Sequence, residues 1–234
     1  MPFVLPGEKE KAMKFKAVIF DLDGTLLDSL TDLANTLNCV FEKNGLPLHS
    51  HEKIRYLIGY GMSELVRRAL PAEFRNMRDL FERLKQEMQE HYAVSWKDNT
   101  RPYPGIDELL DWLQASPIKT GVLSNKPDRF TKLCVETLLQ DWKFDCVMGH
   151  RDGLSHKPDP EGALLMAKEM GVDPSGILYA GDTEVDMLTA RAAGMYPLGV
   201  LWGFRTKKEL LESGAKKLVE TPQEIIAWLS QDKP

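Results

Sequence analysis

The sequence predicts an α/β fold, in which a doubly wound, Rossmann-like parallel sheet carries an inserted all-helical domain. Two observations lead to this prediction. Short apolar runs alternate with helix-like segments from residue 105 onward, which is typical of βαβ units. Residues 28–102 show only helical periodicity, and a stretch of this length does not fit a single crossover. The chain of 234 residues has room for both parts.

The first strand is expected at residues 16–21, an apolar run that ends in an acid. Such continuous apolar character fits a strand buried on both faces of a parallel sheet. Because parallel crossovers are right-handed, the intervening helices should complete a doubly wound layer structure. Further strands are expected at residues 118–123, 144–148, 177–180 and 197–201, and helices at residues 105–115, 128–139, 160–171 and 184–194.

The inserted segment carries two long apolar stripes at helical spacing, over residues 30–41 and 74–88. A shorter helix at residues 63–70 lies between them, with Ser63 as its expected N-cap. Helix packing explains most of these apolar residues better than ligand binding does. The segment should therefore fold as a small helical unit.

Proline and glycine punctuate the return from this unit at residues 101–105, so we expect a hinge there and at residues 27–30. The expected division of the chain is an N-terminal extension at residues 1–14, a core domain at residues 15–27 and 103–234, and an inserted helical domain at residues 28–102.

Composition excludes several classes of function. A net charge of −5 lacks the basic excess that nucleic-acid binding requires. No stretch approaches the roughly 18 apolar residues of a membrane-spanning helix, and the start of the chain lacks a signal-peptide pattern. The three cysteines form no Cys-x-x-Cys pair, which fits a reducing cytoplasm. We expect a cytoplasmic monomer or homodimer with no nucleic-acid or membrane partner.

Polar clusters follow the apolar runs, where ligands bind in open α/β sheets. Several carboxylates in one place suit Mg²⁺, which also takes substrate phosphate as a ligand. An aspartate can then act as a covalent nucleophile on phosphorus, while hydroxyl, amide and lysine groups offset the charge of the transferring oxygens. The clusters contain Asp21 and Asp23, Ser124 and Asn125, Lys157, and Asp182 and Asp186.

At these residues the chain resembles the haloacid dehalogenase superfamily of phosphohydrolases, from about residue 15 to residue 230. The resemblance implies that Asp21 is the nucleophile and a Mg²⁺ ligand. It implies that Asp23 is the general acid and base, and that its main-chain carbonyl also binds Mg²⁺. The other implied roles are metal ligand for Asp182, support of the metal or its water for Asp186, and phosphate binding for Ser124, Asn125 and Lys157.

The residues at 57–70, 181–187 and 202–205 are similar to those of phosphoglycolate phosphatases. The best single substrate is therefore 2-phosphoglycolate, a small phosphorylated metabolite that would yield glycolate and phosphate. Asp23 favours a phosphoester over a carbon–halogen bond, because an alcohol leaving group needs a proton and a halide does not. By the same resemblance, the helical domain at residues 28–102 is a cap that closes over the active site of the catalytic core. Candidates for substrate contacts from this cap are Arg55, Tyr60 and Arg67, together with Arg68. An arginine on a helix, however, often only faces solvent.

Three alternatives stay open. Sugar-phosphate phosphatases, nucleotidases and pyrophosphatases share parts of these motifs. A phosphomutase of the β-phosphoglucomutase kind has the same core, but its cap usually supplies a histidine near the hinge and residues 28–34 contain none. A phosphate-binding regulatory protein without turnover is the alternative from a different class.

Overall fold

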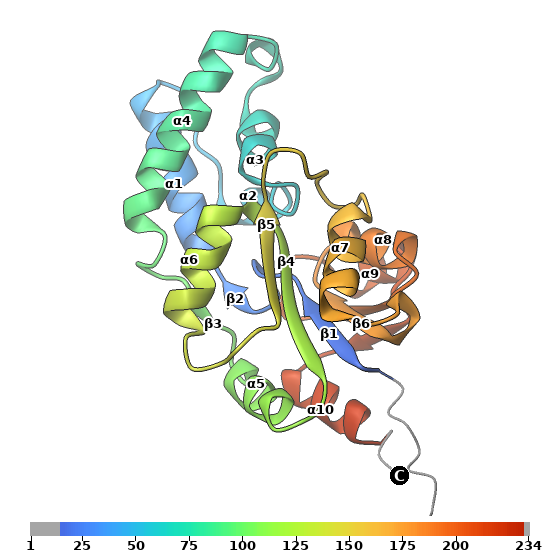
Figure 1. The fold of residues 1–234 in the computed structure, drawn as a ribbon. Coiled ribbons are helices and arrows are strands. Elements are labelled where there is room, and N and C mark those ends of the chain that lie inside the picture. The colour runs from blue at the N-terminus through green and yellow to red at the C-terminus, as the bar shows by residue number, and fades with distance from the viewer. Residues whose placement is uncertain (1–14, 232–234) are drawn as a thin grey trace, which may run out of the picture.

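A parallel sheet of six strands forms the centre of the structure, a computed structural model that describes residues 15–231 (Figure 1). The strand order is β5-β4-β1-β6-β7-β8, which confirms the predicted doubly wound class. The expected extension at residues 1–14 lies outside the described residues. The strands are β1 (Ala17–Phe20), β4 (Lys119–Pro127), β5 (Cys146–His150), β6 (Ile177–Gly181), β7 (Tyr196–Val200) and β8 (Lys217–Val219).

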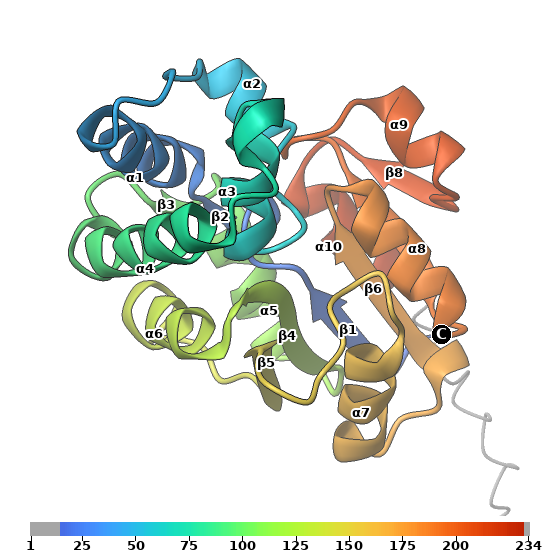
Figure 2. The same ribbon diagram turned by 90° about the horizontal axis from the view of Figure 1, so that it is seen from above.

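Helices cover both faces of this sheet (Figure 2). In β1, Val18 and Phe20 pack into the core beneath α5, α6 and α10, whereas Ala17 and Ile19 pack into the core beneath α7 and α8. Alternate residues of a strand point to opposite faces, so a strand buried on both sides must be apolar throughout. The core helices are α5 (Ile106–Gln114), α6 (Asp128–Leu138), α7 (Glu161–Met170), α8 (Glu184–Ala192), α9 (Lys207–Glu212) and α10 (Pro222–Gln231).

A helical unit between β1 and α5 lies above the carboxyl ends of the strands in Figure 1. Its two longest helices, α1 and α4, pack against each other, and α3 packs on α4. Apolar side chains such as Leu37 and Leu84 are fully buried here, as the stripes predict. The helices of this unit are α1 (Leu30–Lys43), α2 (His51–Arg55), α3 (Met62–Ala69) and α4 (Arg78–Ser95), with a short 3₁₀ turn at Ala72–Phe74.

The start of α3 differs from the expectation. The helix begins at Met62 with Gly61 as its N-cap, so Ser63 lies inside the first turn and is not the cap. Gly61 has a φ of 88°, a left-handed value that favours glycine. A side chain at this position would also lie within 2.9 Å of the main-chain oxygen of Asn125. Contact with the core therefore decides where this helix begins.

The sequence does not predict one helix start and several short elements. The helix α4 begins at Arg78 and not at residue 74, because Met77 is extended and Phe74 belongs to the preceding 3₁₀ turn. The edge strand β8 and the helices α9 and α10 were not expected, since β8 has only three residues and shows no clear periodicity. Among residues 15–231, no helix combines the length and the apolar character needed to cross a bilayer.

The two chain crossings between sheet and helical unit form a small ribbon. They are β2 (Leu27–Asp28) and β3 (Arg101–Pro102), which pair antiparallel where the two hinges were expected. Beside them, the buried carboxylate of Asp32 accepts hydrogen bonds from the main-chain N–H of both Asn99 and Thr100, and from both of their side chains, at 2.7–3.0 Å. The start of α1 is thereby tied to the end of the helical unit.

Replacing Asp32 with alanine should lower the free energy of unfolding by about 3 kcal/mol, because several partly buried donors lose their acceptor. Burial alone would raise the pKa of Asp32, but the hydrogen bonds from Thr100 and Asn99 outweigh it and hold the pKa below its ordinary value. This contribution is complete above the unfolded pKa of about 3.9 and is lost as the pH falls toward the folded pKa. Urea unfolding of both proteins at pH 7 and below pH 4 measures the difference.

The matched control is Asp79→Ala, an exposed acid in the first turn of α4, which should change stability by no more than about 0.5 kcal/mol. An equal effect of the two substitutions at pH 7 would contradict the role given to Asp32.

Candidate active site

Three buried carboxylates meet at the carboxyl edge of the sheet. Asp21 follows β1, Asp182 follows β6, and Asp186 lies in the first turn of α8. One oxygen from each lies within 4.8 Å of the others. All three residues are at most 4% exposed, so water contributes little to balancing their charge. Residues more than 160 positions apart in the sequence thus form one acidic cluster, as the order of the sheet requires.

Hydrogen bonds fix two of these carboxylates. Asp182 accepts from the Thr25 hydroxyl at 2.9 Å and from the main-chain N–H of Phe204 at 2.8 Å. Asp186 accepts from the main-chain N–H and the hydroxyl of Thr183, at 3.0 and 2.8 Å, which completes a capping box at the start of α8. Gly24, with a φ of 84°, leaves the space that Asp182 occupies. The turn after β1 and the start of α8 are therefore built around the cluster.

Lys157 is the cation that contacts the cluster. Its Nζ lies 2.7 Å from Asp186 Oδ1 and 3.0 Å from Asp21 Oδ1, and it donates to the main-chain oxygen of Leu123 at 3.0 Å. Burial raises the pKa of Asp21 to about 7, against the opposing effect of Lys157. Burial and the neighbouring Asp186 and Asp21 raise the pKa of Asp182 as well. One ammonium group does not balance three carboxylates, so the site favours additional positive charge.

This donor set fits a hard divalent cation. Carboxylate oxygens are the ligands that Mg²⁺ takes in proteins, and the raised pKa values show the cost of ionising the cluster without one. Asp21 and Asp182, two of the expected ligands, lie in the cluster, and Asp186 joins them. The side chain of Asp23 lies outside this cluster.

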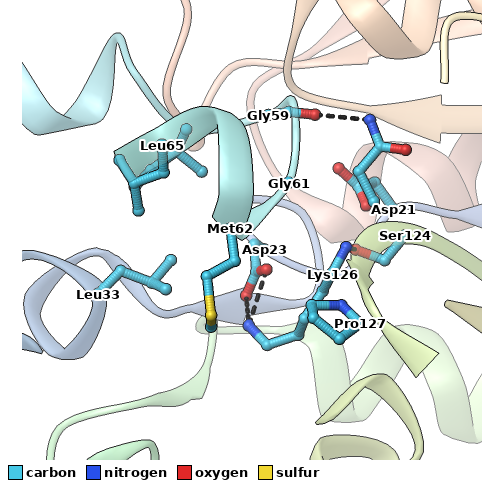
Figure 3. A pocket seen from close by; sticks show the side chains of 12 residues that line it. Asp21, Asp23, Leu33, Gly59, Gly61, Met62, Leu65, Ser124, Lys126 and Pro127 are labelled. Carbon is cyan, nitrogen blue, oxygen red and sulfur yellow. Dashed lines mark hydrogen bonds and ion pairs between the residues drawn. The ribbon is translucent and has the colours of Figure 1, made fainter. Parts of the chain in front are cut away.

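Asp23 faces the helical unit and is held by two donors (Figure 3). Lys126 Nζ lies 2.6 Å from Asp23 Oδ1 and 2.8 Å from Oδ2, and the Ser29 hydroxyl donates to Oδ1 at 2.6 Å. Lys126 itself is buried, with Tyr92 of α4 on one side of its ammonium group at 4.9 Å from the ring centre. The sequence analysis assigns no role to Lys126. The feature that could have identified it is its position directly after Ser124 and Asn125, at the end of a buried strand.

Ser124 and Asn125 both line the cavity that contains Asp21 and Asp23. The Asn125 side chain is already fully engaged there. Its Nδ2 donates to the oxygens of Gly59 and Lys157, at 2.9 and 3.0 Å, and its Oδ1 accepts from the Lys157 main-chain N–H at 2.8 Å. These contacts are internal to the protein, and phosphate binding at Asn125 stays a prediction. The side chain connects β4, the Lys157 segment and the helical unit.

The cap candidates Arg55, Tyr60 and Arg67 do not line that cavity. Arg55 donates to the main-chain oxygens of Phe204 and Gly203, both at 2.7 Å. Tyr60 donates to Glu184 at 2.8 Å, and Arg67 forms an ion pair with Glu64 of its own helix. Two of the three thus join the helical unit to the core.

Arg205 makes the reciprocal contact from the core. Its guanidinium donates to the main-chain oxygens of Arg55 and Ile58, at 2.9 and 3.0 Å, and pairs with Glu184 at 2.9 Å. Arg55 and Arg205 therefore each bind main-chain oxygens of the opposite unit, and we call this pair of contacts the arginine exchange. Neither partner was identifiable from the sequence, because main-chain acceptors have no sequence signature.

The order of these groups along the chain can be compared with known families. A family model for haloacid dehalogenase-like hydrolases matches residues 18–200, a span that contains the whole acidic cluster and Lys157. The chain belongs to the haloacid dehalogenase-like hydrolases. Within that family it is a phosphatase, similar to phosphoglycolate phosphatases, as the following relatives show.

The similar proteins include phosphatases with different named substrates. N-acetylmuramic acid 6-phosphate phosphatase from Pseudomonas aeruginosa is 33% identical over 73% of this chain and 75% of that protein. Phosphoglycolate phosphatase 1 from the same organism is 31% identical over 71% of this chain, but the match spans only 62% of that protein. A crystal structure of a provisionally assigned phosphoglycolate phosphatase from Lactobacillus delbrueckii subsp. bulgaricus has a TM-score of 0.87 and 31% identity, covering 93% of this chain and 99% of that one.

The stabilising effect of Mg²⁺ on this phosphatase should increase from pH 5.5 to pH 8. The folded pKa of Asp21, about 7, lies above the unfolded value of about 3.9, so without metal its contribution to stability is lost as the pH rises through 7. Mg²⁺ bound to the ionised carboxylates would offset this loss. At pH 8 and Mg²⁺ at 100 times its Kd, we expect about 2.7 kcal/mol of stabilisation. Thermal unfolding with EDTA or with Mg²⁺ at both pH values measures it, and an equal effect at both would contradict the account.

The arginine exchange should hold the helical unit against the core. Arg55→Met removes two charged hydrogen bonds, and we expect a loss of about 2 kcal/mol in the free energy of unfolding and a several-fold rise in KM. Arg67→Met is the matched control, because Glu64 and Phe81, which Arg67 contacts, belong to its own helical unit. Urea unfolding and steady-state kinetics test both variants. A KM effect confined to Arg67→Met would support substrate binding by Arg67 and contradict this assignment.

Proposed function

We propose that this phosphatase hydrolyses a small phosphomonoester in two steps, through a phosphoryl group carried on Asp21 and with Mg²⁺ in the acidic cluster. The observation that supports it best is the shared cavity of Asp21, Asp23 and Ser124, with Lys157 beside Asp21. Asp21, Asp182 and the main-chain carbonyl of Asp23 would hold the metal, supported by Asp186. When bound, Mg²⁺ supplies positive charge that offsets the repulsion between the acidic cluster and the phosphate.

In the first step, a carboxylate oxygen of Asp21 attacks phosphorus. Asp21 Oδ1 already accepts from the main-chain N–H of Leu22 at 2.7 Å and faces Lys157, which leaves Oδ2 as the nucleophilic oxygen. The new O–P bond forms while the bond from phosphorus to the alcohol oxygen breaks. Asp23 gives its proton to that alcohol oxygen, and the alcohol leaves.

In the second step, water attacks phosphorus and transfers a proton to Asp23. The bond between phosphorus and Asp21 breaks, which releases phosphate and restores both aspartates. Lys157, Ser124 and Asn125 would bind the phosphoryl oxygens throughout. Asp23 thus acts first as an acid and then as a base. From its position beside Lys126 and Ser29, its carboxylate must reach the alcohol oxygen in the first step and the water oxygen in the second.

Similarity suggests candidate substrates. Relatives are named for 2-phosphoglycolate and for N-acetylmuramic acid 6-phosphate. The first candidate substrate is 2-phosphoglycolate, because more of the similar relatives are named for it. A cytoplasmic location is proposed as well, because Cys39, Cys134 and Cys146 are all unpaired.

Asp21→Asn should abolish Mg²⁺-dependent phosphate release, with a loss of at least about 10³-fold in kcat, because the amide cannot attack phosphorus.

Asp23→Asn should lower kcat/KM for alkyl phosphates by about 10²–10⁴-fold but affect p-nitrophenyl phosphate much less, since nitrophenolate leaves without a proton. Phosphate release from both classes of ester measures these effects. Near wild-type turnover by Asp21→Asn would reject the covalent mechanism, and equal losses for both esters would reject Asp23 as the acid.

A further inference from the structure

The cavity beside Asp21 and Asp23 has an apolar half. Leu33 from α1, Ile58, and Met62 and Leu65 from α3 line it on the side of the helical unit, and each is at most 6% exposed. Figure 3 shows Leu33, Met62 and Leu65 beyond Asp23 as seen from Asp21. We call these four residues the leaving-group pocket. A phosphate at Asp21 would direct its alcohol toward them.

Among residues 15–231, Lys126 is the one cationic side chain in the lining of this cavity, and it is already engaged. Its ammonium group contacts both oxygens of Asp23, and the Tyr92 ring covers another side of it. Only 3% of its side chain is exposed. Lys126 could bind a substrate carboxylate only by giving up part of its contact with Asp23, which the reaction needs in place.

The arginines of the helical unit near this cavity have partners elsewhere. Arg55 binds the main-chain oxygens of Gly203 and Phe204, as part of the arginine exchange. Arg67 pairs with Glu64 and lies over Phe81, and Arg68 lies over the ring of Tyr60 at 3.5 Å. None of them lines the cavity. A carboxylate in the leaving-group pocket would therefore lose water without gaining an ion pair, which is strongly unfavourable.

We infer that the leaving-group pocket selects phosphate esters of small, uncharged alcohols with an apolar surface, and that it disfavours esters whose alcohol carries a carboxylate. Because the phosphate chemistry comes from the proposed function, the inference rests on it. If the inference holds, kcat/KM is lower for 2-phosphoglycolate, the candidate supported by the names of relatives, than for neutral esters of the same size.

Two isosteric esters test this specificity. In 2-phosphoglycolate the ester CH₂ carries a carboxylate, and in isobutyl phosphate it carries an uncharged group of the same branching and number of heavy atoms. Phosphate release by the wild-type protein with saturating Mg²⁺ gives kcat/KM for each. We expect at least a ten-fold preference for isobutyl phosphate. An equal or higher kcat/KM for 2-phosphoglycolate would overturn the inference.

A variant with a new cation tests the cause. Leu65→Lys places an ammonium group in the leaving-group pocket and should shift the ratio of the two kcat/KM values toward 2-phosphoglycolate by at least ten-fold. Leu65→Met, which roughly conserves volume and adds no charge, is the uncharged comparison at the same position. The wild-type comparison stands even if Leu65→Lys does not fold. The same ratio in Leu65→Lys as in Leu65→Met would overturn the assignment of specificity to this pocket.

Hydrolysis of p-nitrophenyl phosphate separates the inference from the function on which it rests. Mg²⁺-dependent turnover of this ester together with a preference for 2-phosphoglycolate overturns only the inference. Absence of Mg²⁺-dependent turnover with all three esters overturns the proposed function and the inference with it.

Discussion

Three buried carboxylates meet at the carboxyl edge of the sheet, two of them in contact with Lys157, and much of the surrounding structure serves to hold them there. Thr25, Thr183 and the N–H of Phe204 each donate to a member of the cluster. Glycine is required at position 181 too, because a side chain there would collide with Asp186. Such an arrangement is electrostatically costly alone, and in the proposed function a divalent cation and a phosphate would offset that cost.

The same edge also determines where the helical unit lies. Asn125 joins the Lys157 segment to Gly59, and the arginine exchange fastens the next part of the unit to the loop after β7. Lys126 extends this connection, because it contacts Asp23 on the core and Tyr92 on α4. Asp23, Asn125 and the helical unit are therefore positioned by one connected set of contacts.

The sequence predicts the parts of this architecture that depend on pattern and order. Apolar runs buried on both faces identify β1, β4, β5, β6 and β7, and the polar residues that follow them identify Asp21, Ser124 and Asp182. Contacts between distant residues are not predictable in this way. Lys126 lies 103 positions from Asp23, and Arg55 lies 148 and 149 positions from its two acceptors, which are main-chain oxygens. Arg55 and Arg67 were therefore expected at the substrate on residue type alone, whereas tertiary packing gives them other partners.

Formation of a phosphoryl group on Asp21 is the most direct measure of the central claim, because it needs the acidic cluster, the metal and the nucleophile together. The measurement is the mass of the protein after turnover of p-nitrophenyl phosphate is stopped by acid within the first cycle, with peptide mapping of the adduct. The account predicts one phosphoryl group on Asp21, labile to hydroxylamine, formed with Mg²⁺ and absent with EDTA. Rapid phosphate release without an adduct, or an adduct on another residue, would contradict it.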